Sequence, residues 1–165
     1  MSGWELELLG AGDFPPEDGS TYYENALVKA RFGRERAGPD EWVLGEDSGI
    51  EVEALDGRPG IESARWASDP VSALLEALDG VTQRAARYRC ELVCVGPGGE
   101  ELRGTGTLEG RISEEPRGHE GFGYDPIFIP VGEERTVAEL GNDWKAHNSH
   151  RARAAAALLR EADHG

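Results

Sequence analysis

The feature that most constrains this chain is a pair of adjacent carboxylates placed just after a short apolar run. Residues 42–44 are Trp-Val-Leu, and one glycine separates them from Glu46 and Asp47. Ser48 and Gly49 follow, and then an alternating run at 50–55. The pattern predicts a strand, an acidic tip, a turn and a second strand. Neighbouring residues of a strand point to opposite faces, so at most one of the two carboxylates can face a given site.

The residues of this acidic tip are compatible with two interpretations. Carboxylate oxygens at a strand end suit Mg²⁺, which takes a few of them and leaves other positions for water and phosphate. A solvated hairpin tip is equally compatible, because the whole chain is acidic, with 32 Asp and Glu against 17 Lys and Arg. The net charge of −15 argues against a nucleic-acid backbone or an anionic membrane as the main partner. A small anionic substrate remains compatible with this net charge if local cations or a metal offset the negative electrostatic potential of the protein.

The 165 residues predict one domain over 1–165. No signal peptide opens the chain, and no apolar run is long enough to cross a membrane. Cys90 and Cys94 lie four residues apart on a predicted strand, so their Cα atoms would be roughly 13 Å apart, too far for a disulfide. They are typical of buried thiols in a reduced, cytoplasmic protein.

The first half of the chain predicts a strand at 4–9, a loop rich in Pro, Gly and Asp at 10–19, and a helix from about 20 to 37. Thr21 and Glu24 have the spacing of a capping box at the start of that helix. The box gives Glu24 a purely structural role as an alternative to any role in a site. Asp69 followed by Pro70 predicts a second helix, which ends at Gly80.

The second half predicts a hairpin followed by short helices. Residues 86–95 and 101–109 are its two strands, with the turn at 96–99. Gly104 and Gly106 predict a weak return strand or a bulge. Residues 136–140 predict a short capped helix, residues 141–145 a loop, and Ser149 caps a last helix from 150 to about 162.

Two further stretches contain residue types suited to a ligand. Residues 117–126 are rich in glycine, and Phe122 and Tyr124 offer ring faces to a flat base, although aromatic residues are more often core residues. His150 and Arg151 occupy the first turn of the last helix, where cations oppose the helix dipole. Cations at a helix start depart from the usual charge preference, and such a departure favours a functional role for these residues. The unpaired backbone amides at this helix start also suit an anion or a carbonyl oxygen. Two ordinary surface cations are the alternative.

Taken together, the motifs resemble the inosine/xanthosine triphosphate pyrophosphatase family, whose members remove non-canonical purine nucleotides. Any one of the four stretches is a weak signal, but order and spacing agree from about residue 4 to about residue 160. The stretches are residues 21–30 (Thr-Tyr-Tyr-Glu-Asn-Ala-Leu-Val-Lys-Ala), residues 46–49 (Glu-Asp-Ser-Gly) with residues 60–65 (Gly-Ile-Glu-Ser-Ala-Arg), residues 121–128 (Gly-Phe-Gly-Tyr-Asp-Pro-Ile-Phe), and Lys145 with residues 149–151 (Ser-His-Arg).

The resemblance implies an α/β fold with a long, mixed, strongly twisted sheet, flanking helices and a site in a central cleft. It implies Mg²⁺-dependent hydrolysis of inosine, deoxyinosine and xanthosine triphosphates to the monophosphate and pyrophosphate, usually by homodimers. By position, Glu24 and Asp47 resemble the metal carboxylates, Glu46 supports the metal through its shell, and Asp47 is also the general base. The residues that resemble the substrate contacts are Ser48, Phe122, Gly123, Tyr124, Asp125, Lys145, His150 and Arg151.

One departure from the family pattern matters for activity. The resemblance implies an initial strand, a Thr/Ser-x-Asn-x-x-Lys loop that holds the triphosphate, and a helix, and no stretch here matches them. The chain therefore resembles an N-terminally short member, either because it begins downstream of the true start or because it is a natural short variant. A nucleotide-binding homologue with weak or no catalysis is the alternative to an active pyrophosphatase. An acidic α/β domain without a small-molecule site is a third.

Overall fold

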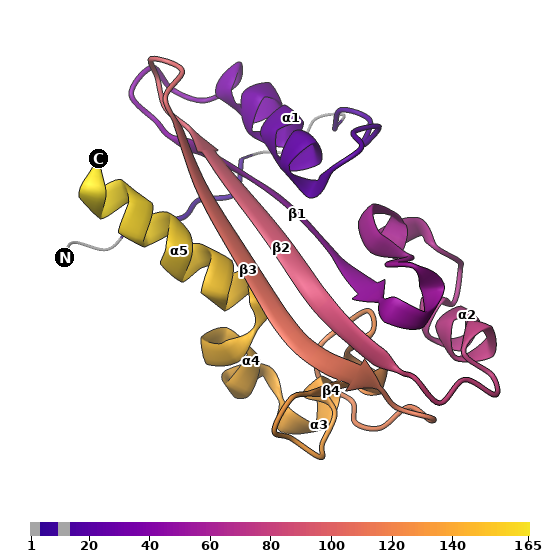
Figure 1. The fold of residues 1–165 in the computed structure, drawn as a ribbon. Helices are drawn as coiled ribbons and strands as arrows, with labels where there is room; N and C mark the ends of the chain where they lie inside the picture. The colour runs from indigo at the N-terminus through magenta and orange to yellow at the C-terminus, as the bar shows by residue number, and fades with distance from the viewer. Residues whose placement is uncertain (1–3, 10–13) are drawn as a thin grey trace.

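A computed structural model describes residues 4–9 and 14–165 of the chain (Figure 1). The helices are α1 (Tyr22–Arg34), α2 (Pro70–Ala77), α3 (Val137–Leu140), α4 (Asn142–Asn148) and α5 (His150–His164). The strands are β1 (Val43–Val52), β2 (Ala85–Val95), β3 (Glu101–Ile112) and β4 (Phe128–Pro130). Short 3-10 turns lie between them: η1 (Glu53–Leu55), η2 (Gly60–Arg65) and η3 (Asp125–Ile127).

The four strands form one sheet in the order β1-β2-β3-β4, and every neighbouring pair is antiparallel. The α/β class and the helices flanking the sheet are confirmed. A mixed sheet was expected from the family resemblance, whereas the sheet in the described part of the chain is antiparallel. One of the three antiparallel pairs is a hairpin, since the turn at 96–99 reverses β2 directly into β3.

The two faces of the sheet pack against different helices, α1 on one face and α5 on the other. Val93 and Val95 of β2 pack against Ala26 and Ala30 of α1. Residues of the opposite face pack against α5, as Figure 1 shows for the two helices on either side of the long strands. Four of these residues were predicted to share a buried face and do so: Tyr88, Cys90, Leu92 and Cys94. Both cysteines are free, so the prediction of no disulfide is confirmed.

The predicted helix caps are confirmed as local sequence signals. The Thr21 side chain accepts from the Glu24 amide, and Asp69 accepts from the Ser72 amide. Ser149 caps α5 through the amide of Ala152. A side-chain oxygen at each of these positions satisfies an amide that has no partner within the helix. These caps fix where α1, α2 and α5 begin, and α5 is one of the helices that form the site.

Two glycines of β3 allow α5 to approach the sheet closely. A Cβ atom at Gly106 would lie 2.0 Å from the His150 carbonyl oxygen, and one at Gly104 would lie 2.2 Å from the Ala154 carbonyl oxygen. The register of β2 and β3 is continuous through both positions, so the expected bulge is wrong. The glycines make room for a helix backbone, and this places the first turn of α5 against the middle of the sheet.

We expect Gly106→Ala to destabilise the protein by about 3 kcal/mol, because the new methyl group would meet a backbone oxygen that only a shift of α5 can relieve. Chemical denaturation monitored by circular dichroism measures the change. Glu109→Ala, at an exposed position of the same strand, is the control and should change stability by less than about 1 kcal/mol. Equal stability of the Gly106→Ala variant and the parent would show that α5 does not need this close approach.

Three predicted elements are wrong. β1 runs without interruption from Val43 to Val52, so the acidic pair lies in mid-strand and Ser48-Gly49 is no turn. Every residue of β1 has a partner in β2, and this ladder overrides the local turn signal. Residues 4–9 form no strand and are exposed, although Trp4 makes an edge-on contact with Trp42. Residues 142–145 open α4 instead of forming a loop.

Some expectations fall partly or wholly outside what the structure describes. Of the predicted loop at 10–19, residues 10–13 lie outside the described residues, and 14–19 contain no helix or strand. The first helix ends at Arg34, three residues before the predicted end. Across residues 4–9 and 14–165, none of the helices combines the length and the apolar character that a membrane span requires.

Candidate active site

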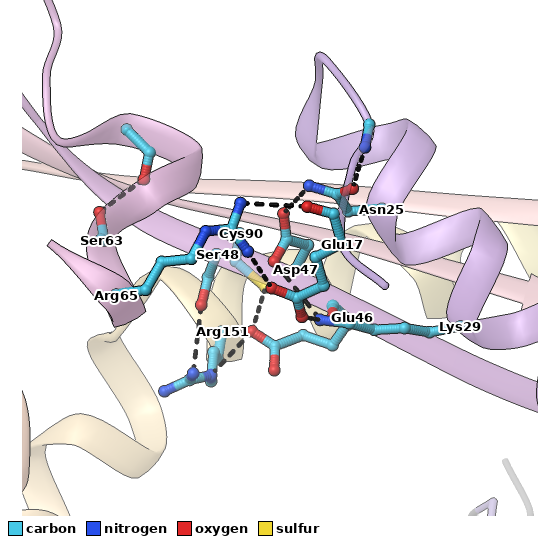
Figure 2. A network of polar contacts seen from close by, with 12 residues as sticks. Glu17, Asn25, Lys29, Glu46, Asp47, Ser48, Ser63, Arg65, Cys90 and Arg151 are labelled. Carbon is cyan, nitrogen blue, oxygen red and sulfur yellow. Dashed lines mark hydrogen bonds and ion pairs between the residues drawn. The ribbon is translucent and has the colours of Figure 1, made fainter. Parts of the chain in front are cut away.

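Glu46 and Asp47 lie at the centre of β1 and point to opposite faces of the sheet. The Arg151 Nε of α5 donates to Glu46 Oε1 at 3.1 Å, and the Asn25 Nδ2 of α1 donates to Asp47 Oδ2 at 3.1 Å. The two helices that pack on opposite faces thus each hold one of the two carboxylates. Figure 2 shows this arrangement, with Arg151 on one side of the strand and Asn25 and Lys29 on the other.

Asp47 is held by a small polar network from α1 and the segment before it. Lys29 Nζ lies 3.5 Å from Asp47 Oδ1, donates to the Glu46 carbonyl at 2.9 Å, and forms an ion pair with Glu17. Arg65 of η2 extends the network, since its Nη2 donates to the Glu17 carbonyl at 3.0 Å. These contacts place a cation beside Asp47 without neutralising it through a close bidentate pair.

Burial raises the pKa of Asp47 above its ordinary value, and the hydrogen bond from Asn25 and the charge of Lys29 only partly offset this. The side chain is 8% exposed. A carboxylate whose charged form is poorly solvated binds protons and cations more readily than a surface carboxylate. Asp47 therefore has the electrostatic character of a general base or a metal ligand.

Glu24 lies in the exposed first turn of α1, one residue before Asn25. Its Oε2 accepts from the Ser20 amide at 2.6 Å and from the Ser20 hydroxyl at 2.8 Å, and these bonds lower its pKa. In the predicted capping box, the Glu24 carboxylate would accept from the Thr21 amide. It accepts from the Ser20 amide instead. In the described ranges, His, Cys, Asp and Glu side chains form no group of three or more that could hold a metal ion. The structure consequently does not gather Glu24, Glu46 and Asp47 into one metal cluster.

Arg151 connects β1 to an exposed aromatic ring. Its Nη2 donates to Ser48 Oγ at 3.1 Å while its Nε holds Glu46, so the guanidinium spans two residues of one strand face. Its Cζ lies 5.0 Å from the centroid of the Phe122 ring, and Lys145 Nζ lies 4.2 Å from the same centroid. Phe122 is 64% exposed. A largely exposed flat ring with two cations close to it suits a planar, electron-rich ligand.

Asp125 is a buried residue whose carboxylate binds three groups near that ring. Its carboxylate accepts from the Tyr88 hydroxyl at 2.9 Å, from Lys145 Nζ at 2.6 Å and from the Phe122 amide at 3.0 Å. The chain turns at Gly123, whose φ of 60° favours glycine. The carboxylate thus fixes both the ammonium group and the backbone of the aromatic residue.

Tyr124, the next aromatic residue, is 5% exposed, and its hydroxyl donates to the Ser63 carbonyl at 2.8 Å. Burial raises its pKa to about 12. Its ring belongs to the core cluster that contains Ile50 and Phe128. The residue anchors the glycine-rich loop to η2, while Phe122 is the aromatic residue that faces solvent.

His150 is buried and stacked on Tyr88, with ring centroids 4.5 Å apart and planes 8° apart. Burial, and then the charges of Arg151 and Lys145, lower its pKa to about 3. The ring is therefore neutral near pH 7, with one N–H donor and one acceptor nitrogen. Its Nδ1 has no hydrogen-bond partner in the described part of the chain. Arg151 is thus the one charged residue of the pair at the start of α5.

The structure brings most of the predicted residues into two adjacent groups. The group on the α1 side of the sheet holds Asp47, whereas the Glu24 carboxylate is bonded to Ser20 and, within the described part of the chain, forms no hydrogen bond or ion pair with this group. The group on the α5 side comprises Glu46, Ser48, Phe122, Asp125, Lys145, His150 and Arg151. Asn25, Lys29 and Tyr88 were missed as individual site residues. The spacing of Asn25 and Lys29, four apart on one helix face, is the signal that could have identified both.

An α/β domain with an exposed ring, flanking cations and a partly buried carboxylate has the features of a nucleotide-handling enzyme. The Ham1 family sequence model matches residues 3–161, and the chain belongs to this family. A dITP/XTP pyrophosphatase of Bdellovibrio bacteriovorus is 43% identical, covering 94% of this chain and 84% of the relative. One of Exiguobacterium is 47% identical, covering 92% and 81%. The solved structure of a HAM1 protein from Coxiella burnetii has a TM-score of 0.83 at 35% identity, covering 93% and 82%.

We expect Asp47→Asn to be at least as stable as the parent at pH 7 in the presence of a chelator. The folded-state pKa of Asp47 is raised, so folding favours its protonated form, and the charged form costs stability above that pKa. The advantage of Asn should shrink as the pH falls towards 3, where the parent carboxyl is protonated in both states. Urea denaturation at several pH values measures the difference.

The matched control is Asp69→Asn, because hydrogen bonds at the start of α2 lower the pKa of Asp69. Its charged form is favoured by folding, so this substitution should lower stability at pH 7 and lose its effect at low pH. A pH trend of the same sign in both variants would contradict the assignment of a raised pKa to Asp47.

Proposed function

We propose that this chain is a Mg²⁺-dependent pyrophosphatase for non-canonical purine nucleoside triphosphates, namely the inosine, deoxyinosine and xanthosine forms. The observation that carries the proposal is the placement of Arg151, which joins the exposed Phe122 ring to the strand that bears Asp47. The relatives named dITP/XTP pyrophosphatases support the same reaction. No observation favours the alternative of a nucleotide-binding homologue without catalysis.

The base would stack on Phe122 and present its edge to α5. A 6-keto purine has an acceptor oxygen where adenine has an amino group. Arg151 supplies N–H donors, and neutral His150 supplies one donor and one acceptor, with an unpartnered Nδ1 among the described residues. Adenine would set its amino group against these donors and leave buried polar groups unpaired, which is a strong basis for rejection. Lys145, held by Asp125, adds a cation beside the ring.

The triphosphate would cross from the base pocket towards the α1 face, where Asp47 lies. An attacking water forms a bond to the α-phosphorus, the bond to the bridging oxygen breaks, and pyrophosphate leaves with the monophosphate as the second product. Asp47 accepts the proton of that water, and its raised pKa brings it closer to the working pH. Lys29 stabilises negative charge close to Asp47.

The residues on the α1 side fit Mg²⁺ bound together with substrate. Mg²⁺ typically takes one or two carboxylates and completes its coordination with water and substrate phosphate, so a cluster of three acidic side chains is not required. Asp47 would hold the ion, with Glu24 as a second ligand. Glu46 faces α5, where Arg151 holds it, so the expected role of Glu46 in the shell of the metal is not part of the proposal. Bound there, Mg²⁺ neutralises phosphate charge and lowers the pKa of a coordinated water. We extend the proposal to a homodimer on the strength of the family resemblance.

The direct test is pyrophosphate release from inosine triphosphate and from ATP, with Mg²⁺ and with a chelator. We expect turnover of inosine triphosphate far above that of ATP, and none when the metal is chelated. Asp47→Asn should reduce the rate more than tenfold while the fold is retained, because an amide is a poor base and a weaker metal ligand. A variant that keeps more than about a tenth of the rate has lost under about 1.4 kcal/mol of barrier stabilisation, which would remove Asp47 as the base.

Glu24→Gln separates the structural role of Glu24 from a role in metal binding. Gln can still accept from Ser20, so the helix cap should persist and the stability of the variant should stay close to that of the parent. Loss of a metal carboxylate should raise the Mg²⁺ concentration needed for half-maximal activity several-fold. Glu35→Gln, at the opposite end of α1, is the control. An unchanged Mg²⁺ titration in the Glu24 variant would leave only the capping role.

A further inference from the structure

Each of the two cations beside the Phe122 ring is paired with one carboxylate. Lys145 Nζ lies 2.6 Å from Asp125 Oδ2, and Arg151 Nε lies 3.1 Å from Glu46 Oε1. Asp125 is 3% exposed and also holds the backbone of the loop that bears Phe122. Glu46 has no such loop to hold, and the family resemblance places it near the metal. The face of the sheet on which its carboxylate lies does not fit that place.

The contacts of the Glu46 carboxylate are all on the α5 side of β1. Asp47, its neighbour, is bonded to α1 on the opposite face. Besides Arg151, the Glu46 carboxylate has the Cys90 thiol beside it, with Sγ 3.8 Å from Oε1. Burial, and then the charge of Glu46, raise the pKa of that thiol well above its ordinary value, so the thiol stays neutral. The backbone carbonyl of Glu46 accepts from Lys29 of α1, but its charge is directed at Arg151.

The guanidinium of Arg151 is fixed at two points and still has donors available. Its Nε donates to Glu46 and its Nη2 to Ser48, two residues apart on one face of β1, as Figure 2 shows. Its Nη1 has no hydrogen-bond partner among residues 4–9 and 14–165, and the side chain is 39% exposed. A guanidinium held in this way can offer its remaining N–H groups in one fixed direction.

A fixed arginine and a mobile one would have different effects on nucleotide selection. Every nucleoside triphosphate carries the same phosphates, and only the base distinguishes one from another. An arginine free to turn to the phosphates would strengthen the binding of all of them alike and add nothing to selectivity. Arg151 also lies at the start of α5, where the helix dipole repels a cation, so it needs an anion to hold it there.

We propose that Glu46 is a positioning residue for base selection. Its carboxylate keeps Arg151 beside the Phe122 ring, where the guanidinium meets the edge of a 6-keto purine instead of the phosphates. This role depends on the base pocket of the proposed function. The two adjacent carboxylates of β1 then have different tasks, since Glu46 acts on selectivity through Arg151, whereas Asp47 acts on the metal and the attacking water.

The test compares the binding of inosine monophosphate and adenosine monophosphate to the chelator-treated protein by calorimetry. The parent should prefer inosine monophosphate, and Glu46→Ala should reduce this preference about tenfold, because the donor to the base is no longer held in place. Glu46→Gln should keep most of the preference, since an amide oxygen can still accept from Arg151 Nε. Glu51→Ala is the control, because Glu51 lies on the same strand and pairs with Arg87 at 3.3 Å. It should bind like the parent.

A double-mutant cycle separates positioning from a general structural effect. In a protein that already carries Arg151→Ala, the further change Glu46→Ala should not alter the preference between the two monophosphates, because Glu46 acts only through the arginine. A purely structural role would weaken the binding of both nucleotides alike, with or without Arg151. That result, or an unchanged preference in the single Glu46→Ala variant, would overturn the proposal.

Turnover of inosine triphosphate with Mg²⁺ adds a second readout. Glu46→Ala should raise KM several-fold with little change in kcat, as expected when an interaction made equally in the ground state and the transition state is lost. The Mg²⁺ concentration for half-maximal activity should stay that of the parent, in contrast to the shift expected for Glu24→Gln. A shifted Mg²⁺ titration in Glu46→Ala would return Glu46 to the metal and contradict the positioning role.

The outcomes distinguish this role from the proposed function. A parent that prefers inosine monophosphate through Glu46, but hydrolyses no inosine triphosphate, would refute the pyrophosphatase activity alone. A parent that hydrolyses inosine triphosphate, with a Glu46→Ala variant that is equally selective, would refute the role of Glu46 alone. A parent that binds both monophosphates equally would overturn the base pocket and the role of Glu46 together.

Discussion

The alternation of side chains along β1 is the constraint on which the candidate site depends. Glu46 and Ser48 point to the α5 face, where Arg151 binds both, and Asp47 points to the α1 face, where Asn25 and Lys29 hold it. In the proposed function, this strand therefore separates the residues that contact the base from those that act on the phosphates. Moving the register of β1 by one residue would exchange the two faces and destroy both groups at once. The uninterrupted pairing with β2 protects that register.

Close backbone approach places the two helices accurately enough for this division. Gly45 of β1 lies where a Cβ atom would be 2.1 Å from the Ala26 carbonyl of α1, and Gly106 of β3 serves α5 in the same way. Asn25 directly precedes Ala26 in the sequence, and Arg151 directly follows His150, whose carbonyl oxygen contacts Gly106. Helix position and site geometry are therefore set by the same packing, and a change that moves either helix away from the sheet also moves the groups that bind Asp47 or Glu46.

The sequence predicted the local parts of this structure better than the long-range ones. The caps at Thr21, Asp69 and Ser149 are local hydrogen bonds, and all three were predicted. The acidic hairpin tip was wrong, because its Ser-Gly turn signal is local, whereas the pairing of β1 with β2 joins residues about 40 positions apart. Tyr88 was predicted only as a strand residue, since nothing in its neighbours along the chain indicates that it meets both Asp125 and His150.

Tyr88 supports several residues of the proposed base pocket and contributes to the burial that keeps His150 neutral. Its hydroxyl donates to Asp125, Asp125 binds Lys145, and its ring stacks on His150, so three of the proposed substrate contacts share one buried support. Stacking removes water from the imidazole, and the nearby ammonium and guanidinium groups oppose a third positive charge. The pocket thus keeps its cations on Lys145 and Arg151 and leaves His150 neutral. A neutral ring with one donor and one acceptor reads the hydrogen-bonding pattern of a base edge, whereas an imidazolium would offer donors alone.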